Sequence, residues 1–129
     1  MERLYHLDLD QKYVSNIKLV VDERIDAPDI KIDIILDYEK VIGYLEGTVE
    51  EERLFIKNIF VDENERNRGI ASSALRQLGT FLRRNMKEIS ELAVAVNEDE
   101  SINKLFEYVG FARFKETDKD DLYIKYIKY

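Results

Sequence analysis

Apolar residues in this chain fall into short runs that are separated by polar turns. β-Branched and aromatic residues are concentrated in segments 31–37, 41–47, 54–61, 92–97, 111–115 and 122–129. Such enrichment is typical of strands, and the charged clusters between these segments are typical of turns. We therefore predict a strand over each segment, with polar turns at 50–52 and 116–121.

Two further segments have a helical pattern. Apolar residues recur at helical spacing at Ala71, Ala74, Leu75, Leu78 and Leu82, which predicts a helix from about Gly69 to Met86. A second helix is expected to end near Val109, where Gly110 is suited to terminate it. At its start, Asn97 with Glu100 three residues later resembles a capping box, so Asn97 has a structural role whether or not it contacts a ligand.

The N-terminal third allows two interpretations. Val14, Ile17, Val21 and Ile25 fit one face of a helix, whereas residues 17–21 followed by the Pro28 region equally suggest a strand and a turn. We favour the strand.

The junction between segment 54–61 and the long helix has the outline of a phosphate site. Arg66, Gly69 and Ala71 form an Arg-x-x-Gly-x-Ala pattern where the strand gives way to the helix. A helix N-terminus carries partial positive charge and attracts phosphate, and glycine allows a ligand to approach the backbone closely. Arginines surround this end and continue along the helix, at positions 66, 68, 76, 83 and 84. For Arg83 and Arg84 we favour a structural role, because cations near a helix C-terminus complement its dipole.

This motif resembles the signature of the GCN5-related N-acetyltransferase (GNAT) superfamily, Arg/Gln-x-x-Gly-x-Gly/Ala. A second block, Ser101-Ile-Asn-Lys-Leu-Phe-Glu-Tyr-Val-Gly-Phe111, resembles the family's closing helix at the expected distance. The resemblance covers roughly residues 30 to 129, with its specific motifs between 54 and 111.

The resemblance implies an α/β (α+β) fold with a mixed, mostly antiparallel central sheet, flanked by helices. The fourth and fifth strands would splay apart, and the N-terminal helical region is abbreviated because little room exists for the family's two early helices. We expect residues 1–129 to form a single acetyltransferase-like domain.

The resemblance also implies acetyl-CoA as the cosubstrate, inserted between the two splayed strands. The strand backbone would pair with pantetheine, and the turn after it would hold the pyrophosphate through backbone N–H groups. The residues expected at the cofactor are Ile59, Phe60, Val61, Arg66, Asn67, Arg68, Gly69, Ile70 and Ala71, with Asn97 and Asn103 as further candidates from the second block.

The catalytic residues are the least determined part of the prediction. Many family members place a tyrosine general acid where this chain has Phe106, which has no proton to donate, and Tyr108 is about 200° further round the helix. The family often places a carboxylate on the fourth strand, where this chain offers Lys57 and Asn58. Weak alternatives are Glu46, Tyr44 and Glu52, followed by Glu51 and His6. Precise placement of two reactants can contribute about 7–11 kcal/mol, so catalysis does not require every one of these groups.

Composition narrows the remaining choices. The formal net charge of −7 argues against a general nucleic-acid binder, and the absence of cysteine excludes disulfides and thiolate metal sites. We expect no metal, no membrane association and a cytoplasmic location.

Segment 122–129 is apolar on both pleat faces, which fits either a covered strand or the edge of a homodimer.

Two functional classes follow. The first is an N-acetyltransferase that moves an acetyl group to a primary amine, on a small molecule or a protein, by direct attack in a ternary complex. The second is a non-catalytic acyl-CoA-binding or protein-interaction module with a degenerate active site.

Overall fold

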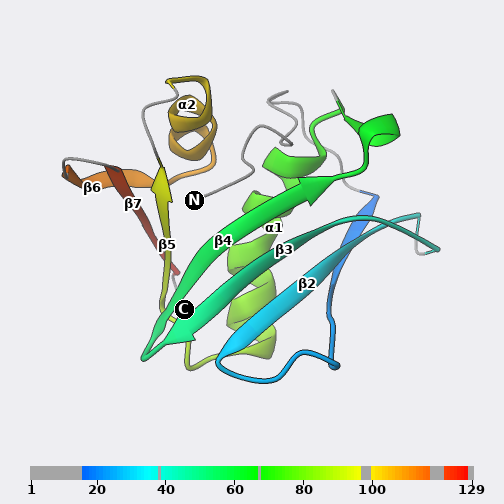
Figure 1. Cartoon of the computed structure of the whole chain (residues 1–129), viewed down its shortest axis with the longest axis horizontal. Coiled ribbons are helices and arrows are strands. Elements are labelled where there is room, and N and C mark those ends of the chain that lie inside the picture. The colour runs from blue at the N-terminus through cyan, green and yellow to red at the C-terminus, as the bar shows by residue number, and fades with distance from the viewer. Residues whose placement is uncertain (1–15, 38, 67, 97–99, 117–120, 128–129) are drawn as a thin grey trace.

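The computed structural model describes residues 16–37, 39–66, 68–96, 100–116 and 121–127. Its centre is a seven-stranded sheet with the order β1-β2-β3-β4-β5-β7-β6 (Figure 1). The strands are β1 (Ile17–Val21), β2 (Asp29–Leu36), β3 (Lys40–Glu50), β4 (Arg53–Val61), β5 (Glu91–Val96), β6 (Ala112–Glu116) and β7 (Asp121–Tyr126). A 3-10 turn, η2 (Glu63–Glu65), precedes helix α1 (Ile70–Asn85), and α2 (Glu100–Tyr108) follows β5.

Every neighbouring pair of strands is antiparallel except β4 and β5, which are parallel. This confirms the predicted mixed, mostly antiparallel sheet. β7 lies between β5 and β6, so the apolar segment at 122–129 supplies an interior strand and not a sheet edge. Residues 128–129, at the end of that predicted strand, lie outside the described residues, as does Asn97 at the end of the strand predicted over 92–97.

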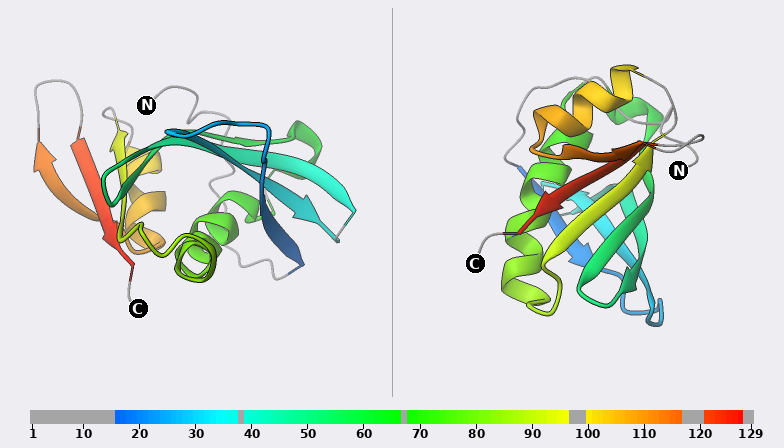
Figure 2. Two further views of the ribbon diagram at one scale, coloured as in Figure 1. Left: turned by 90° about the horizontal axis from the view of Figure 1, so that it is seen from below. Right: turned by 90° about the vertical axis from the view of Figure 1, so that its left-hand side faces the viewer.

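Helix α1 covers one face of the sheet and provides much of the core. Its buried apolar stripe consists of Ile70, Ala71, Ala74, Leu75, Leu78 and Leu82, the positions whose spacing predicts the helix. Burying each leucine contributes about 1.5–3 kcal/mol. The stripe packs in one cluster with alternate strand residues, among them Ile32, Ile34, Leu45 and Ile59. Figure 2 shows α1 and α2 on the same side of the sheet. The guanidinium group of Arg76 in α1 stacks over the ring of Tyr108 in α2.

The N-terminal strand confirms the favoured interpretation of residues 17–21. β1 pairs with β2 in an antiparallel hairpin, and the connecting residues 22–28 contain no helix. The hairpin turn is fixed by Asp22, whose carboxylate accepts hydrogen bonds from the Arg24 side chain at 2.8 and 2.9 Å. These bonds lower the pKa of Asp22 to about 2. The two helices that the family places between its first two strands are therefore replaced by a short turn.

Helix α2 ends at Tyr108, one residue before the predicted end near Val109, and Gly110 terminates it as predicted. This glycine has φ +101°, and the Phe111 amide donates to the Phe106 carbonyl at 2.9 Å. That hydrogen bond and the left-handed glycine are the features of a Schellman motif. The turn returns the chain into β6.

Candidate functional site

The central feature of the candidate site is a gap between two parallel strands. β4 and β5 pair only where Arg53, Leu54 and Phe55 face Glu91, Leu92 and Ala93. Beyond Phe55 the two strands diverge, although β4 continues to Val61 and β5 to Val96 (Figure 1). At the closed end, Arg53 Nε donates to Glu91 Oε2 at 2.8 Å. The divergence opens toward the end of β4 that leads into α1.

A β-bulge in β4 marks the place where the strands separate. Glu46 of β3 faces Asn58, but the next residue, Gly47, faces Ile56, so Lys57 is the extra residue of β4. Because of this insertion, Ile56 and Ile59 both point into the core although they are three residues apart. Bulges redirect side chains and terminate pairing. The bulge has a signal in the sequence: apolar residues alternate at Leu54 and Ile56, skip to Ile59 instead of residue 58, and then alternate again at Val61. The strand predicted over 54–61 did not include this bulge.

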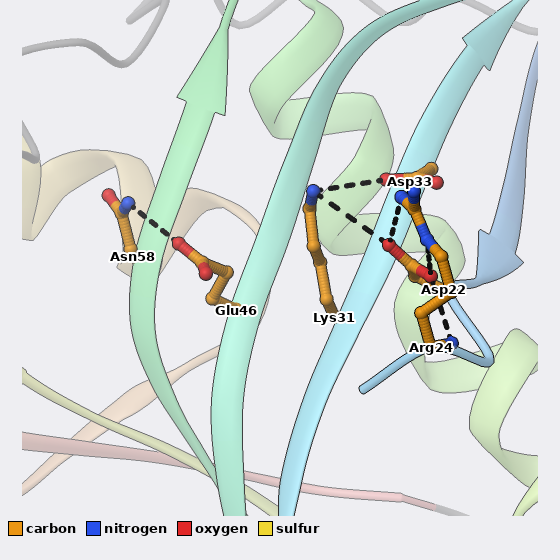
Figure 3. Close-up of polar contacts among 6 residues, drawn as sticks. All are labelled: Asp22, Arg24, Lys31, Asp33, Glu46 and Asn58. Carbon is orange, nitrogen blue, oxygen red and sulfur yellow. Dashed lines mark hydrogen bonds and ion pairs between the residues drawn. The ribbon is translucent and has the colours of Figure 1, made fainter. Parts of the chain in front are cut away.

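The bulge brings a carboxylate and an amide together on the open face of the sheet. Asn58 Nδ2 donates to Glu46 Oε1 at 3.1 Å, and Figure 3 shows the two side chains pointing toward one another from adjacent strands. The Asn58 Oδ1 atom is buried and has no hydrogen-bond partner among the described residues. Reversing the amide would turn this oxygen toward the carboxylate, so the observed orientation is the favourable one. Among the described residues, an unsatisfied buried acceptor therefore lies on β4, three residues beyond the last residue of β4 that pairs with β5.

A ladder of rings and cations crosses the same face of the sheet. Tyr44 of β3 stacks on Phe60 of β4 with ring centroids 5.3 Å apart. Lys31 lies over the Tyr44 ring at 4.7 Å, and Arg66 lies over the Phe60 ring at 5.7 Å. The Arg66 Nε also donates to the Val61 carbonyl at 2.8 Å. The side chain of Arg66 thus fixes the end of β4 and the entrance to the turn.

The other end of that turn is the N-terminus of α1. Gly69 is the N-cap residue and adopts φ +84°, a left-handed conformation that suits glycine. The Ser73 amide and the Ser72 hydroxyl both donate to the Gly69 carbonyl, at 3.0 and 3.2 Å. Arg68 pairs with Glu65 at 3.1 Å. The positive end of a sixteen-residue helix is therefore held beside the end of β4.

The remaining predicted residues fall into three groups. Phe106 is fully buried and packs edge-on against Phe111 with ring centroids 5.2 Å apart. Glu51 and Glu52 lie in the β3–β4 turn at the closed end of the gap, where the Glu52 carbonyl accepts from the Ser90 amide at 2.8 Å. His6, Asn67 and Asn97 lie outside the described residues, and of Asn103 only its place in α2 is described.

No helix in the described part of the chain is long and apolar enough to cross a membrane. Among those residues, no group of three or more histidine, aspartate or glutamate side chains is arranged to hold a metal ion.

Comparison with solved structures gives the same architecture at low sequence identity. A GNAT family acetyltransferase from Elizabethkingia anophelis, solved with acetyl-CoA bound, matches with a TM-score of 0.69 and 14% identity, over 88% of this chain and 99% of that one. The paiA N-acetyltransferase from Thermoplasma acidophilum, in complex with coenzyme A, matches with a TM-score of 0.62 and 17% identity, over 77% of this chain and 61% of that one. A spermidine N-acetyltransferase from Vibrio cholerae matches with a TM-score of 0.65 and 12% identity, over 78% of this chain and 66% of that one. These likenesses show the fold.

A search of curated proteins by sequence gave no match. The family model for acetyltransferases of the GNAT family matches residues 1–111. The match begins well before residue 30, where the resemblance seen in the sequence starts, and it ends at the close of the second motif block. The chain belongs to the acetyltransferase (GNAT) family.

Proposed function

We propose that this protein is an acetyl-CoA-dependent N-acetyltransferase that moves an acetyl group to a primary amine by direct attack in a ternary complex. The observation that carries the proposal is the gap between β4 and β5, whose pairing stops at Phe55 and Ala93. A gap in a sheet leaves main-chain groups at hydrogen-bonding distance from an inserted ligand, and the amides of pantetheine complement such groups.

The cofactor would run from this gap to the start of α1. Pantetheine would lie along Ile59–Val61, and the pyrophosphate would rest on the turn and helix N-terminus at residues 66–71. The left-handed Gly69 supports this placement, because it is the N-cap residue at the positive end of the helix and has no side chain between the backbone and a ligand. The family membership and the acetyl-CoA and coenzyme A bound to two of the matching structures point to the same cosubstrate.

The chemistry would use the Glu46–Asn58 pair. The amine nitrogen attacks the thioester carbonyl carbon, the C–S bond breaks, and the sulfur leaves as the thiolate of CoA. Glu46 is suited to accept a proton from the amine, directly or through a water molecule, because Asn58 of β4 holds its carboxylate at 3.1 Å on the face of the sheet opposite α1. The Asn58 Oδ1, which has no partner in the described part of the chain, is suited to accept an N–H from pantetheine or from the acceptor amine. Phe106 offers no proton, so the thiolate would take one from solvent.

A non-catalytic acyl-CoA-binding module is the alternative. It is favoured by the same Phe106, which is fully buried and packed against Phe111 where many family members have a tyrosine. Two observations weigh against it: the left-handed Gly69 at the N-terminus of α1, and the Glu46 carboxylate that Asn58 of β4 holds by a hydrogen bond. Proximity alone also sustains substantial catalysis.

The test is calorimetric titration with acetyl-CoA, followed by measurement of CoA release with a panel of primary amines that includes a polyamine and peptide N-termini. Gly69→Asp and Gly69→Asn form a matched pair, since both residues tolerate the left-handed conformation and differ in charge. We expect the aspartate to abolish binding and the asparagine to retain most of it. Binding without CoA release on any amine would favour the alternative, and no binding by the folded protein would overturn both functions.

A further inference from the structure

Positive charge is segregated along one part of this acidic chain. Residues 66–87 contain six arginines and lysines and no acidic residue, although the whole protein has a net charge of −7. The first two of these cations, Arg66 and Arg68, belong to the turn before α1. The rest lie on or just after α1, at Arg76, Arg83, Arg84 and Lys87, and the proposed acetyl transfer gives them no role.

A pocket of about 480 Å³ lies beside the middle and C-terminal half of α1. One wall is the helical stripe Arg76, Gly79, Thr80 and Arg83, and the facing wall includes Gly110 and Lys125 of β7. No aspartate or glutamate is among the described residues that line it. Its size is that of a site for a small metabolite.

The cations of this pocket are close enough to affect one another. Lys125 Nζ donates one hydrogen bond to the Val109 carbonyl at 2.9 Å. Burial lowers the pKa of Lys125, and the positive charge of Arg76 lowers it further. A group in this position has an unfavourable electrostatic environment, which an anion in the pocket would relieve. Arg76 is held over the Tyr108 ring at 4.6 Å and can still donate from the edge of its guanidinium group.

Gly79 leaves open space on the helical wall of the pocket. A Cβ atom at this position would meet no heavy atom within 4 Å, so protein packing does not require glycine here. Glycine inside a helix costs about 1 kcal/mol relative to alanine. The absent side chain leaves space on this wall of the pocket, between Arg76 and Arg83.

We propose that this pocket binds a small multivalent anion, of the phosphorylated or polycarboxylate class, at a site separate from the acetyl-CoA cleft. The two sites lie at different points along α1, because residues 79–83 are roughly 15–20 Å along the helix axis from Gly69. Arg76, Arg83 and Lys125 would supply the charge-assisted hydrogen bonds.

Amide NMR spectra of the full chain test this proposal, since three glycines report separately. Gly79 and Gly110 report the pocket, and Gly69 reports the proposed pyrophosphate site. The probes are citrate and inorganic pyrophosphate, which distinguish a carboxylate ligand from a phosphorylated one. We expect at least one probe to shift the Gly79 and Gly110 resonances, with binding that persists when the cleft is saturated with acetyl-CoA.

Variants localise the site. Gly79→Leu fills the pocket with a good helix former, and Arg83→Gln removes one charge, so each should weaken binding by about tenfold or more. Arg84→Gln is the matched control, because it removes the same charge from the next residue, which faces the groove between α1 and β1. The proposal is overturned if neither probe shifts Gly79 and Gly110, if Gly69 alone responds, or if Arg84→Gln weakens binding as much as Arg83→Gln.

Discussion

The hydrogen bond between Glu46 and Asn58 gives the two residues a joint candidate catalytic role that the sequence alone does not show. In the sequence, Glu46 is one of many acids, and Asn58 occupies a place where a carboxylate is more usual. The bulge at Lys57 puts them side by side, so a carboxylate reaches the centre of the sheet from β3 instead of β4. Sequence reasoning named Glu46 as a weak candidate but could not pair it, because the pairing depends on the strand register.

If Glu46 accepts the proton of the amine, Glu46→Gln should lower kcat by about 10²-fold or more, which is the usual contribution of a general base. The binding of acetyl-CoA should change little. The measurement is kcat across a pH series, with Glu52→Gln as the control for loss of one carboxylate at the closed end of the gap. Equal kcat values for Glu46→Gln and wild type would show that the acceptor arrives neutral or uses another base.

Asp22 provides a prediction about acid stability. Its hydrogen bonds from Arg24 lower its pKa in the folded protein to about 2 from its ordinary value of 3.8. A lowered folded pKa stabilises the protein above pH 3.8, and this contribution is lost as the pH falls from 3.8 toward 2. Asp22→Asn should remove that part of the pH dependence. Urea unfolding at a series of pH values measures it, and a variant that keeps the full acid slope between these values would contradict the assignment.

At the scale of elements, local sequence patterns predict most of the helices and strands of this fold. The apolar stripe of α1, the left-handed glycine after α2 and the alternation within β2 and β3 each determine an element without reference to the rest of the chain. The same locality explains what could not be predicted. The end of the β4–β5 ladder, and the packing of Arg66 onto Phe60 and Val61, arise from contacts between elements.

Two glycines of β3 show the same dependence on neighbours. A Cβ atom on Gly47 would clash with the Phe55 carbonyl oxygen, and one on Gly43 with the Phe60 carbonyl oxygen, so β3 and β4 approach closely on both sides of the bulge. Gly47→Ala should destabilise the protein by about 1–3 kcal/mol, as overpacking does. Gly79→Ala is the matched control and should be neutral or stabilising by up to about 1 kcal/mol. Denaturant unfolding of both variants measures the difference, and equal stabilities would refute this account of the β3–β4 contact.

At the scale of the whole molecule, the sheet consists of two parts that are joined only by the short β4–β5 ladder. One part is β1–β4 and the other is β5, β7 and β6 (Figure 2). The β1–β2 connection holds a turn and no helix, so on the face opposite α1 no helix of the described chain covers Tyr44, Glu46 and Asn58.

A ligand that fills the gap should therefore join the two parts of the sheet. On acetyl-CoA binding we expect slower amide exchange in β4 beyond Phe55 and in β5 beyond Ala93, because their main-chain groups gain a partner and lose access to water. Protection of the β1–β2 hairpin should not change, which makes it the internal control. Stability should also rise by about 2.7 kcal/mol at a ligand concentration of about 100 times Kd. Hydrogen exchange with mass spectrometry measures the first effect and thermal unfolding the second. Stabilisation without protection in β4 and β5 would mean that the ligand binds elsewhere, and the gap would then be a feature of the sheet alone.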